Sequence, residues 1–395
     1  EARVIGSIVD FVFAPADHQG CIDKLADPKT KIVSLTVTEK GYCQNVSGDL
    51  DTENAFVKSD LEGDLACPKT AIGMICAALR ARKNRGIESF TVMSCDNLPE
   101  NGDKIKHVVL QMAKYVCREL HAWVSTHTTF PNTMVDRITP VTEEEHIDIV
   151  ARDYYIKDGW PVIAEDFKQW VVEDNFVCGH PPWDKVGALI VEDVKPYEFM
   201  KLRLLNGGHS ALSYISSLCG YAYVDDAMAD PLISDFVMSY FNEMKCTLLP
   251  IPGVDTEDYM QKLIDRFSNP YIKDRCDRLA VDGSKKMQNT MRDGVVELTA
   301  KGLPTTIIAL ANAAWIRYMS SHDPVLSLPW QGNSIVLNDP VKDELCELAK
   351  EAISEPEKPA PERFLHFIHG PQLMECAGFV EQVKQHLISL LSLGD

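Results

Sequence analysis

The sequence predicts an α/β fold in two parts, a first half that alternates strands with helices and a second half that is mostly helical. Short apolar runs alternate with amphipathic segments up to about residue 194, and from Pro196 onward helical spacing dominates. A chain of 395 residues is also too long for one small core. We therefore expect two domains, residues 1–194 and 195–395.

The first domain is expected to contain repeated strand–helix units. Strand-like runs occur at 3–12, 31–37 and 89–94. Helix-like segments occur at 17–26, 68–85 and 103–126. Further extended pieces follow at 160–165 and 185–193. This alternation is typical of βαβ units and predicts a largely parallel sheet.

The second domain is expected to be mostly helical. The clearest helical segments are 196–218, 231–244, 258–267 and 304–319. A Pro-rich stretch at 354–362 predicts a surface loop between late helices.

Composition excludes several partner classes. The chain has 39 basic and 58 acidic residues, a net charge of −19, and no basic block, which argues against nucleic acid as a partner. No apolar run reaches the roughly 18 residues of a membrane span. Twelve cysteines without a C-x-x-C pair indicate reduced thiols and a cytoplasmic protein. The histidines of "HFIH" at 366–369 lack further ligands at zinc-site spacing, so we expect no metal.

The stretch "KLRLLNGGHS" places three polar side chains in apolar surroundings. In a helix that turns about 100° per residue, Lys201, Asn206 and His209 fall within an arc of roughly 140°. Burying such groups without partners is costly. We interpret the trio as one face that points into a polar cavity.

Two further stretches carry polar residues where a ligand could bind. Asp96 and Asn97 follow the strand at 89–94, and open α/β sheets bind ligands beyond the carboxyl ends of their strands. A turn and helix cap would have the same composition. Asp136 and Arg137 lie in an extended segment, where neighbours point to opposite faces, and separate ion pairs explain them equally well.

A basic group lies around a glycine turn in "DRLAVDGSKKM". Arg278, Lys285 and Lys286 would suit an anionic or polyhydroxylated ligand. A solvated helix end gives the same composition, so both interpretations stay open.

Four stretches in one chain, "TVMSCDNLPENG", "FPNTMVDRITP", "PYEFMKLRLLNGGHSALSY" and "DRFSNP", resemble the polyol-specific long-chain dehydrogenase/reductase family. The resemblance runs along the whole chain. It implies a Rossmann-type cofactor domain, then a mostly helical substrate domain, with NAD as cofactor and no metal. It also implies oxidoreduction between a polyol and its ketose, mannitol and fructose above all.

The resemblance also implies roles for individual residues. Lys201 would be the general base, which requires a pKa lowered by burial. Asn97 and Asn206 would hydrogen-bond the developing alkoxide. His209 would orient substrate and lysine, and Glu198 would relay the proton to solvent.

The remaining site residues in the resemblance bind substrate or cofactor. The substrate's other hydroxyls would be held by Asp136, Arg278 and Lys286. Asp96, together with Asn97, would contact the cofactor.

The sequence departs from the family at one point. No G-x-G-x-x-H or G-x-G-x-x-G loop, which would cradle the cofactor's pyrophosphate, occurs in the 395 residues. The chain also starts without Met and with a strand-like run. We therefore expect the Rossmann-type domain to be incomplete, with an N-terminal segment absent. The preference for NAD over NADP is inferred from the family resemblance alone.

Two alternatives to a polyol dehydrogenase remain. One is a sister activity on another polyol or on a sugar acid such as fructuronate, whose carboxylate the cations at 278, 285 and 286 would suit. The other is a non-catalytic binding or structural subunit without cofactor affinity, in which a protein partner covers an exposed strand edge.

Overall fold

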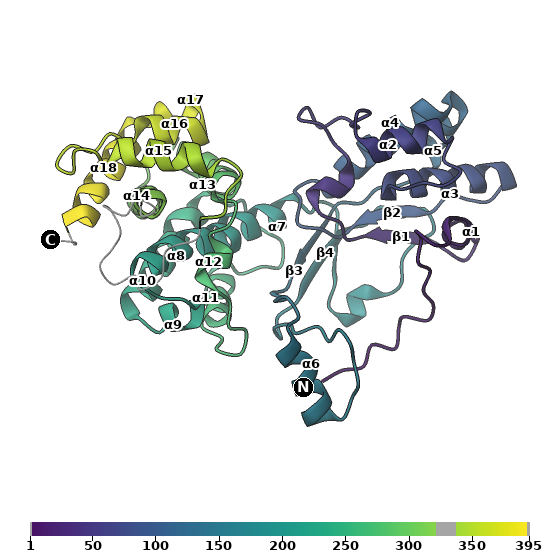
Figure 1. Ribbon diagram of the computed structural model, residues 1–395, viewed down its shortest axis with the longest axis horizontal. Coiled ribbons are helices and arrows are strands. Elements are labelled where there is room, and N and C mark those ends of the chain that lie inside the picture. The colour runs from purple at the N-terminus through teal and green to yellow at the C-terminus, as the bar shows by residue number, and fades with distance from the viewer. Residues whose placement is uncertain (1, 321–336, 393–395) are drawn as a thin grey trace. The chain divides into compact units, whose positions relative to one another are not determined.

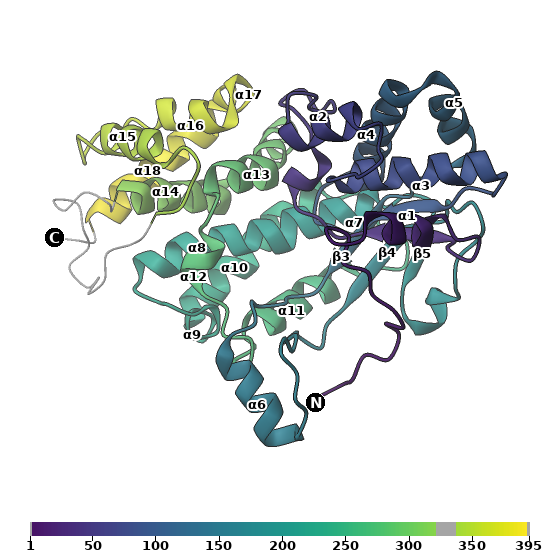
Figure 2. The ribbon, with the colours of Figure 1, turned by 45° about the vertical axis from the view of Figure 1, so that its right-hand side comes forward.

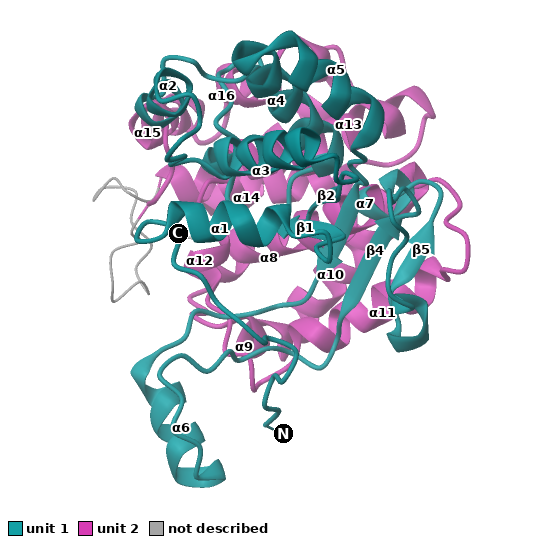
Figure 3. Ribbon diagram, turned by 90° about the vertical axis from the view of Figure 1, so that its right-hand side faces the viewer, with its two compact units in different colours: residues 1–198 teal, residues 199–395 magenta. Residues whose placement is uncertain are grey.

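The computed structural model describes residues 2–320 and 337–392. By its internal contacts the chain divides into two units, Glu1–Glu198 and Phe199–Asp395 (Figure 3). The boundary predicted from the sequence lay at residue 194.

In the first unit, short strands alternate with helices along the chain. Its strands are β1 (Ile32–Leu35), β2 (Thr91–Ser94), β3 (Thr133–Asp136), β4 (Gln169–Glu173) and β5 (Leu189–Val191). Its α-helices are α1 (His18–Ala26), α2 (Ala55–Glu62), α3 (Ala71–Arg85), α4 (Asn101–Val116), α5 (Arg118–His127) and α6 (Glu144–Tyr154), followed by α7 (Lys195–Met200), which reaches the boundary. Two 3₁₀ turns complete it, η1 (Glu39–Tyr42) and η2 (Trp183–Val186).

The strands form two sheets, a parallel pair of strands and a three-stranded sheet of mixed direction. β1 and β2 are parallel, in a register that pairs Ile32 with Thr91 and Leu35 with Ser94. β4 runs antiparallel to β3 and parallel to β5, so the expected largely parallel sheet is mixed. Because β1 and β2 are parallel, the segments that leave their carboxyl ends emerge at one edge.

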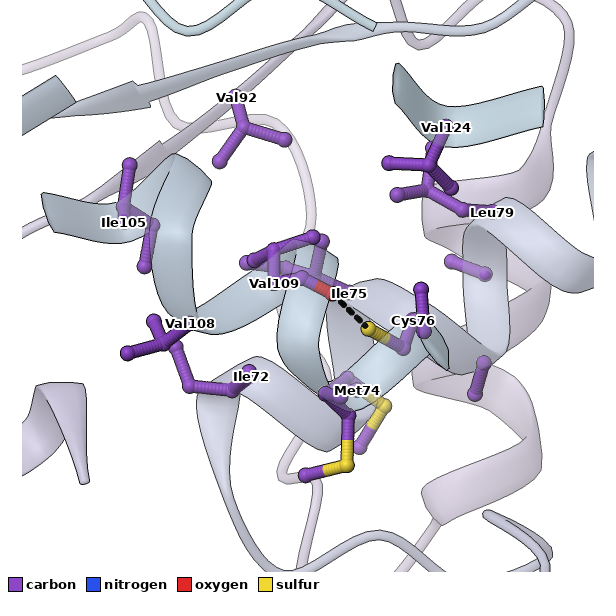
Figure 4. Packing of buried hydrophobic residues seen from close by; sticks show 14 of the residues in the cluster. Ile72, Met74, Ile75, Cys76, Leu79, Val92, Ile105, Val108, Val109 and Val124 are labelled. Atoms are coloured by element: carbon purple, nitrogen blue, oxygen red, sulfur yellow. Dashed lines mark hydrogen bonds between the residues drawn. The ribbon is translucent and has the colours of Figure 1, made fainter. Parts of the chain in front are cut away.

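Helices α3, α4 and α5 form the core of this unit with β2 (Figure 4). Figure 1 shows α3 and α4 along one side of β1 and β2. Ile75 of α3 and Val109 of α4 are buried within this cluster, and the Cys76 thiol donates to the Val109 carbonyl at 3.5 Å. Val92 of β2 is also fully buried there, which fixes β2 and the loop that follows it.

The structure corrects three expectations for the first unit. Residues 3–12 form no strand, and side chains such as Val9 are exposed because no described strand pairs with them. Residues 160–165 form no strand either; β4, which was not predicted, pairs with β3 instead. The helix expected at 103–126 is two helices, since Cys117 is extended and its sulfur accepts from the Leu120 amide at 3.4 Å.

The second unit is helical throughout its described part. Its long helices are α8 (Gly207–Leu218), α10 (Pro231–Met244), α11 (Thr256–Phe267), α13 (Gly283–Ala300), α14 (Thr306–Ser320), α15 (Lys342–Ala352), α16 (Glu362–His369) and α18 (Ala377–Ser392). Its short elements are the π-helical η3 (Lys201–Asn206), α9 (Val224–Met228), η4 (Lys245–Thr247), α12 (Cys276–Leu279) and α17 (Pro371–Met374).

Helix α14 is the central element of this unit. It is buried on nearly all sides, from Ile308 to Ser320, as expected of a helix that is apolar all round. Figures 1 and 2 show α8, α13, α15 and α18 around it. Across the described residues, no helix is both long and apolar enough to cross a membrane.

Candidate active site

The polar trio of the second unit lies on a helix that changes its hydrogen-bond pattern. Residues Lys201–Asn206 form a π-helix between α7 and α8, and the Gly207 amide donates to the Leu202 carbonyl, five residues back. π turns are rare and occur frequently at functional sites. In this repeat, residues five apart take the relation that residues four apart have in an α-helix. Lys201 and Asn206 therefore lie closer to one face than the arc of roughly 140° expected for a regular α-helix.

A partly buried ion pair holds the π-helix in place. Arg203 Nη2 lies 2.6 Å from the Glu297 carboxylate of α13, and its Nη1 donates to the Thr247 carbonyl at 2.8 Å. The Tyr240 hydroxyl donates to the Arg203 carbonyl at 3.0 Å. These bonds satisfy groups that the irregular backbone would otherwise leave unpaired. Lys201, two residues before Arg203, is buried, with 9% of its surface exposed.

Two glycines allow α8 to pack closely behind the trio. A Cβ on Gly207 would lie 2.0 Å from the Tyr240 hydroxyl, and one on Gly208 would lie 2.6 Å from the Phe241 ring. His209 follows them and stacks on Phe267, with ring centroids 4.1 Å apart. The motif "NGGHS" thus sets the depth at which Asn206 and His209 lie in the unit.

The loop after β2 carries the candidate residues Asp96 and Asn97 of the first unit. The Asp96 carboxylate is buried and accepts three hydrogen bonds, from the Tyr42 hydroxyl, from Ser94 Oγ at 2.6 Å and from the Leu98 amide at 3.0 Å. Asn97 itself is exposed. The geometry therefore favours an anchoring role for Asp96, which holds the turn that contains Asn97.

A second set of bonds fixes the far end of this loop. The Asn101 amide donates to the Asp96 carbonyl at 3.3 Å and to the Thr133 carbonyl at 2.9 Å, and its oxygen accepts from the Thr133 amide at 3.0 Å. The next residue, Gly102, comes so near the chain that a Cβ would lie 2.5 Å from the Pro131 carbonyl oxygen. Helix α4 thereby starts directly against the segment that leads into β3.

Glu198 lies at the amino end of α4. Its two carboxylate oxygens accept from the Glu100 amide at 3.2 and 3.4 Å, and Glu100 pairs with Lys195 at 3.0 Å. Burial raises the pKa of Glu198 to about 7, with the Glu100 and Glu173 carboxylates adding to the rise and the Glu100 amide opposing it. A carboxyl group that titrates near neutral pH suits proton transfer.

Asp136, the last residue of β3, is buried with 5% of its surface exposed, whereas Arg137 is exposed. The two neighbours thus lie in different environments, as expected for adjacent strand residues. Arg137 Nε donates to the Glu165 carbonyl at 2.8 Å. Arg137 therefore has a hydrogen-bond partner within the protein.

The basic group of the second unit divides into two environments. Arg278 forms two hydrogen bonds with Asp274, at 2.7 and 2.5 Å, so its charge is compensated within the protein. Lys286 donates to the Leu279 carbonyl at 3.0 Å, and burial lowers its pKa. Lys286 belongs to α13, the helix that also carries Glu297, the partner of the π-helix.

The structure therefore brings some candidates together within each unit. Lys201, Asn206 and His209 share one helix, and Asp96 and Asn97 share one loop. Arg278 lies on α12, in an ion pair with Asp274.

Sequence reasoning missed the residues that hold these groups. They are Tyr42, Ser94, Asn101, Thr133, Arg203 and Glu297. Some of their partners lie up to 94 residues away in the chain, and a local sequence pattern does not reveal such pairings. Four of them, Ser94, Asn101, Thr133 and Arg203, lie in stretches that the sequence analysis had already singled out, whereas Tyr42 and Glu297 do not.

Comparison with known families gives matches over both units. Residues 1–185 match the family described as the mannitol dehydrogenase Rossmann domain, and residues 193–391 match the mannitol dehydrogenase C-terminal domain.

Individual relatives give the same result. A mannitol 2-dehydrogenase of Pyrenophora tritici-repentis is 38% identical over 98% of this chain and 68% of its own length. A D-mannonate oxidoreductase of Escherichia coli is 42% identical over 88% of this chain and 71% of its own. The ternary complex of Pseudomonas fluorescens mannitol 2-dehydrogenase with NAD and D-mannitol is similar in structure, with a TM-score of 0.80 and 40% identity over 99% of this chain and 78% of that one.

Proposed function

The chain belongs to the mannitol dehydrogenase family, and from this premise we propose that it interconverts a polyol and its ketose by NAD-dependent hydride transfer, with mannitol and fructose as the pair. The observation that carries the proposal is the buried Lys201 at the start of a π-helix that also presents Asn206, with His209 in the next turn. This set of groups matches what alcohol oxidation requires: a base, an oxyanion donor and an orienting ring.

The residues at the carboxyl edge of β1 and β2 fit a dinucleotide. In doubly wound sheets the cofactor lies beyond this edge, and here the exposed Asn97 leaves the edge while Asp96 is held back by three hydrogen bonds. We propose Asn97 as the contact to the nicotinamide end, with Asp96 fixing its loop. NAD, when bound, supplies the acceptor for the hydride.

The proton steps belong to the chain's own residues. In polyol oxidation Lys201 takes the proton of the reacting hydroxyl as the carbon gives up its hydride. Asn206 and Asn97 donate hydrogen bonds to that oxygen while its charge grows. Glu198, three residues before Lys201, passes the proton to solvent, a step for which a pKa of about 7 is well placed.

The other hydroxyls of the open-chain substrate need separate partners. We propose Asp136 and Lys286 for this role, because both are polar, Asp136 is buried and Lys286 is half-buried. His209 orients the substrate from its stack on Phe267. Arg278 would contribute only if substrate competes with Asp274 for its guanidinium group.

A sugar acid is the second candidate substrate. The D-mannonate oxidoreductase of Escherichia coli is 42% identical to the chain, and Lys285 is exposed beside Lys286. An exposed cation next to the polyol contacts would suit a carboxylate.

Turnover decides between these candidates. We would measure kcat/KM on mannitol, arabinitol and fructuronate, each with NAD(H) and NADP(H). A clear preference for mannitol with NAD supports the proposal, and a preference for fructuronate replaces it with the sugar-acid activity. If NADH fluorescence shows no saturable binding and no substrate turns over, the chain is a non-catalytic subunit that works through a protein partner.

We further propose a reducing compartment, the cytoplasm, as the place of action. All twelve cysteines are free, and five of them are buried. Mass spectrometry of the native protein after alkylation should find twelve modifiable thiols once it is unfolded.

A further inference from the structure

The hydroxyl of Tyr42 has a partner that none of the roles above explains. Tyr42 ends the turn η1 that follows β1, and Asp96 follows β2, so the two meet at the edge where these parallel strands end. The Tyr42 hydroxyl donates to Asp96 Oδ2 and lies 2.6 Å from Ser94 Oγ. The side chain is completely buried. Burial and the carboxylate raise the pKa of Tyr42, so its hydroxyl stays protonated and remains a donor.

The Asp96 carboxylate controls the direction in which the chain passes Asn97. Its Oδ1 accepts from the Leu98 amide at 3.0 Å, which closes a tight turn around the single residue between them, Asn97. Its Oδ2 is held by Tyr42 and by Ser94. A rotation of the carboxylate would therefore open the turn and move Asn97.

The other side of the loop is already fixed. Asn101 ties the Asp96 carbonyl to Thr133, and α4 begins there. Asp96 is thus held at two points, first its carbonyl and second its carboxylate, and Asn97 follows directly after it. The second depends on a residue of η1, 54 positions earlier in the chain.

We propose that Tyr42 is a positioning residue for the reaction, which acts through Asp96 to hold Asn97 at the angle its hydrogen bond to substrate requires. This inference rests on the proposed function of Asn97. The hydroxyl of Tyr42 touches neither substrate nor cofactor; it stabilises the loop geometry on which the oxyanion contact depends.

Tyr42→Phe tests this directly, because it keeps the buried ring and removes only the hydroxyl. We expect kcat for mannitol oxidation to fall by roughly 10- to 100-fold, the scale of a small misplacement, with KM close to that of the unchanged protein. Tm should fall modestly, because the buried Asp96 carboxylate loses one donor. In an Asn97→Ala background the same change should cost little more, because the group that Tyr42 positions is gone. Amide hydrogen exchange at residues 97–100 should speed up.

A matched control removes a similar bond elsewhere. The Tyr221 hydroxyl donates to Asp230 at 2.9 Å, so Tyr221→Phe deletes a tyrosine–aspartate bond outside the site and should leave kcat unchanged. If Tyr42→Phe does not fold, Ser94→Ala removes the other donor to the same oxygen and should show the same pattern at smaller size.

The outcomes separate this inference from the proposed function. An active wild type whose Tyr42→Phe variant keeps full kcat and unchanged exchange overturns the inference alone. So does a loss that multiplies fully in the Asn97→Ala background. If the wild type turns over no polyol, the proposed function fails, and hydrogen exchange then decides: faster exchange at 97–100 retains Tyr42 as the loop's anchor, and unchanged exchange rejects it.

Discussion

The loop from Ser94 to Asn101 and the segment from Lys201 to His209 present polar side chains by opposite means. In the loop, a network of side-chain hydrogen bonds centred on Asp96 fixes the chain, and Asn97 remains exposed. In the helical segment, packing fixes the chain: two glycines admit neighbouring aromatic rings, and the Arg203–Glu297 ion pair holds an irregular turn.

This difference predicts which substitutions disrupt each region. A hydrogen-bond network fails when one donor is removed, since the partner is left buried and unpaired. A close-packed helix fails when an added methyl group forces its neighbours apart. Substitutions in the two regions should therefore affect activity and stability in different proportions.

The largest effect should come from the helical segment. Lys201→Ala should lower kcat by about 10²- to 10⁴-fold, the contribution of a general base, while NADH affinity and Tm stay near normal. Steady-state kinetics and fluorescence titration check this. Lys262→Ala, an exposed lysine paired with Asp258 at 2.7 Å, is the control and should be fully active. Near-normal turnover of the Lys201 variant would remove it from the role of base.

The next largest effect compares the two amides. Asn206→Ala should cost about 2.7–4 kcal/mol of transition-state stabilisation, as removal of one oxyanion donor does, and Asn97→Ala should cost a similar amount. The measurement is kcat/KM on mannitol for both variants. A loss confined to KM in either variant would show that its amide stabilises bound substrate and transition state equally. It would contradict the proposal that Asn97 and Asn206 play the same role.

A smaller effect concerns the stability that packing gives to the helical segment. Gly208→Ala places a Cβ 2.6 Å from Phe241, and the overpacking should lower the free energy of unfolding by about 1–3 kcal/mol. Urea denaturation measures it. Gly378→Ala in α18, where no atom lies within 4 Å, is the matched control and should not destabilise. Equal stability of both variants would contradict the packing argument.

The smallest expected effect is a dependence on pH. The pKa of Glu198 is raised from 4.5 to about 7 in the folded protein, so folding favours the protonated form. Its contribution is therefore fully present below pH 4.5 and is lost as the pH rises to about 7. Glu198→Gln should reduce the pH-dependent change in the free energy of unfolding across this window by on the order of 1 kcal/mol. Urea denaturation at several pH values measures it. An unchanged slope would contradict the raised pKa.

Much of this architecture follows from sequence patterns, and the remainder depends on distant contacts. The runs that became β1 and β2, and the helices α1, α10 and α14, have the apolar spacing expected of them. Strand β4 escaped prediction because it lies in the polar-flanked stretch "FKQWVVED". The run at 3–12 has a strand's composition, but a strand also requires a neighbour.

The site divides in the same way. The polar trio on the helix was predicted from spacing alone, whereas the π turn beneath it depends on Arg203 meeting Glu297. The roles assigned to the trio and to Asn97 stay predictions until the variants above are measured. The pairing of Tyr42 with Asp96 joins residues 54 positions apart, and no pattern within either stretch contains it.

Because of the π-helix, the number of residues between Lys201 and Asn206 determines which side chains share a face of the helix. Its wide turn accommodates one residue more than an α-helical turn, so deletion of a single residue between 202 and 205 would restore regular α-helix. Everything downstream would then shift in phase by about 100° relative to Lys201. A substitution leaves this phase unchanged, whereas an insertion or deletion changes which side chains share a face with Lys201.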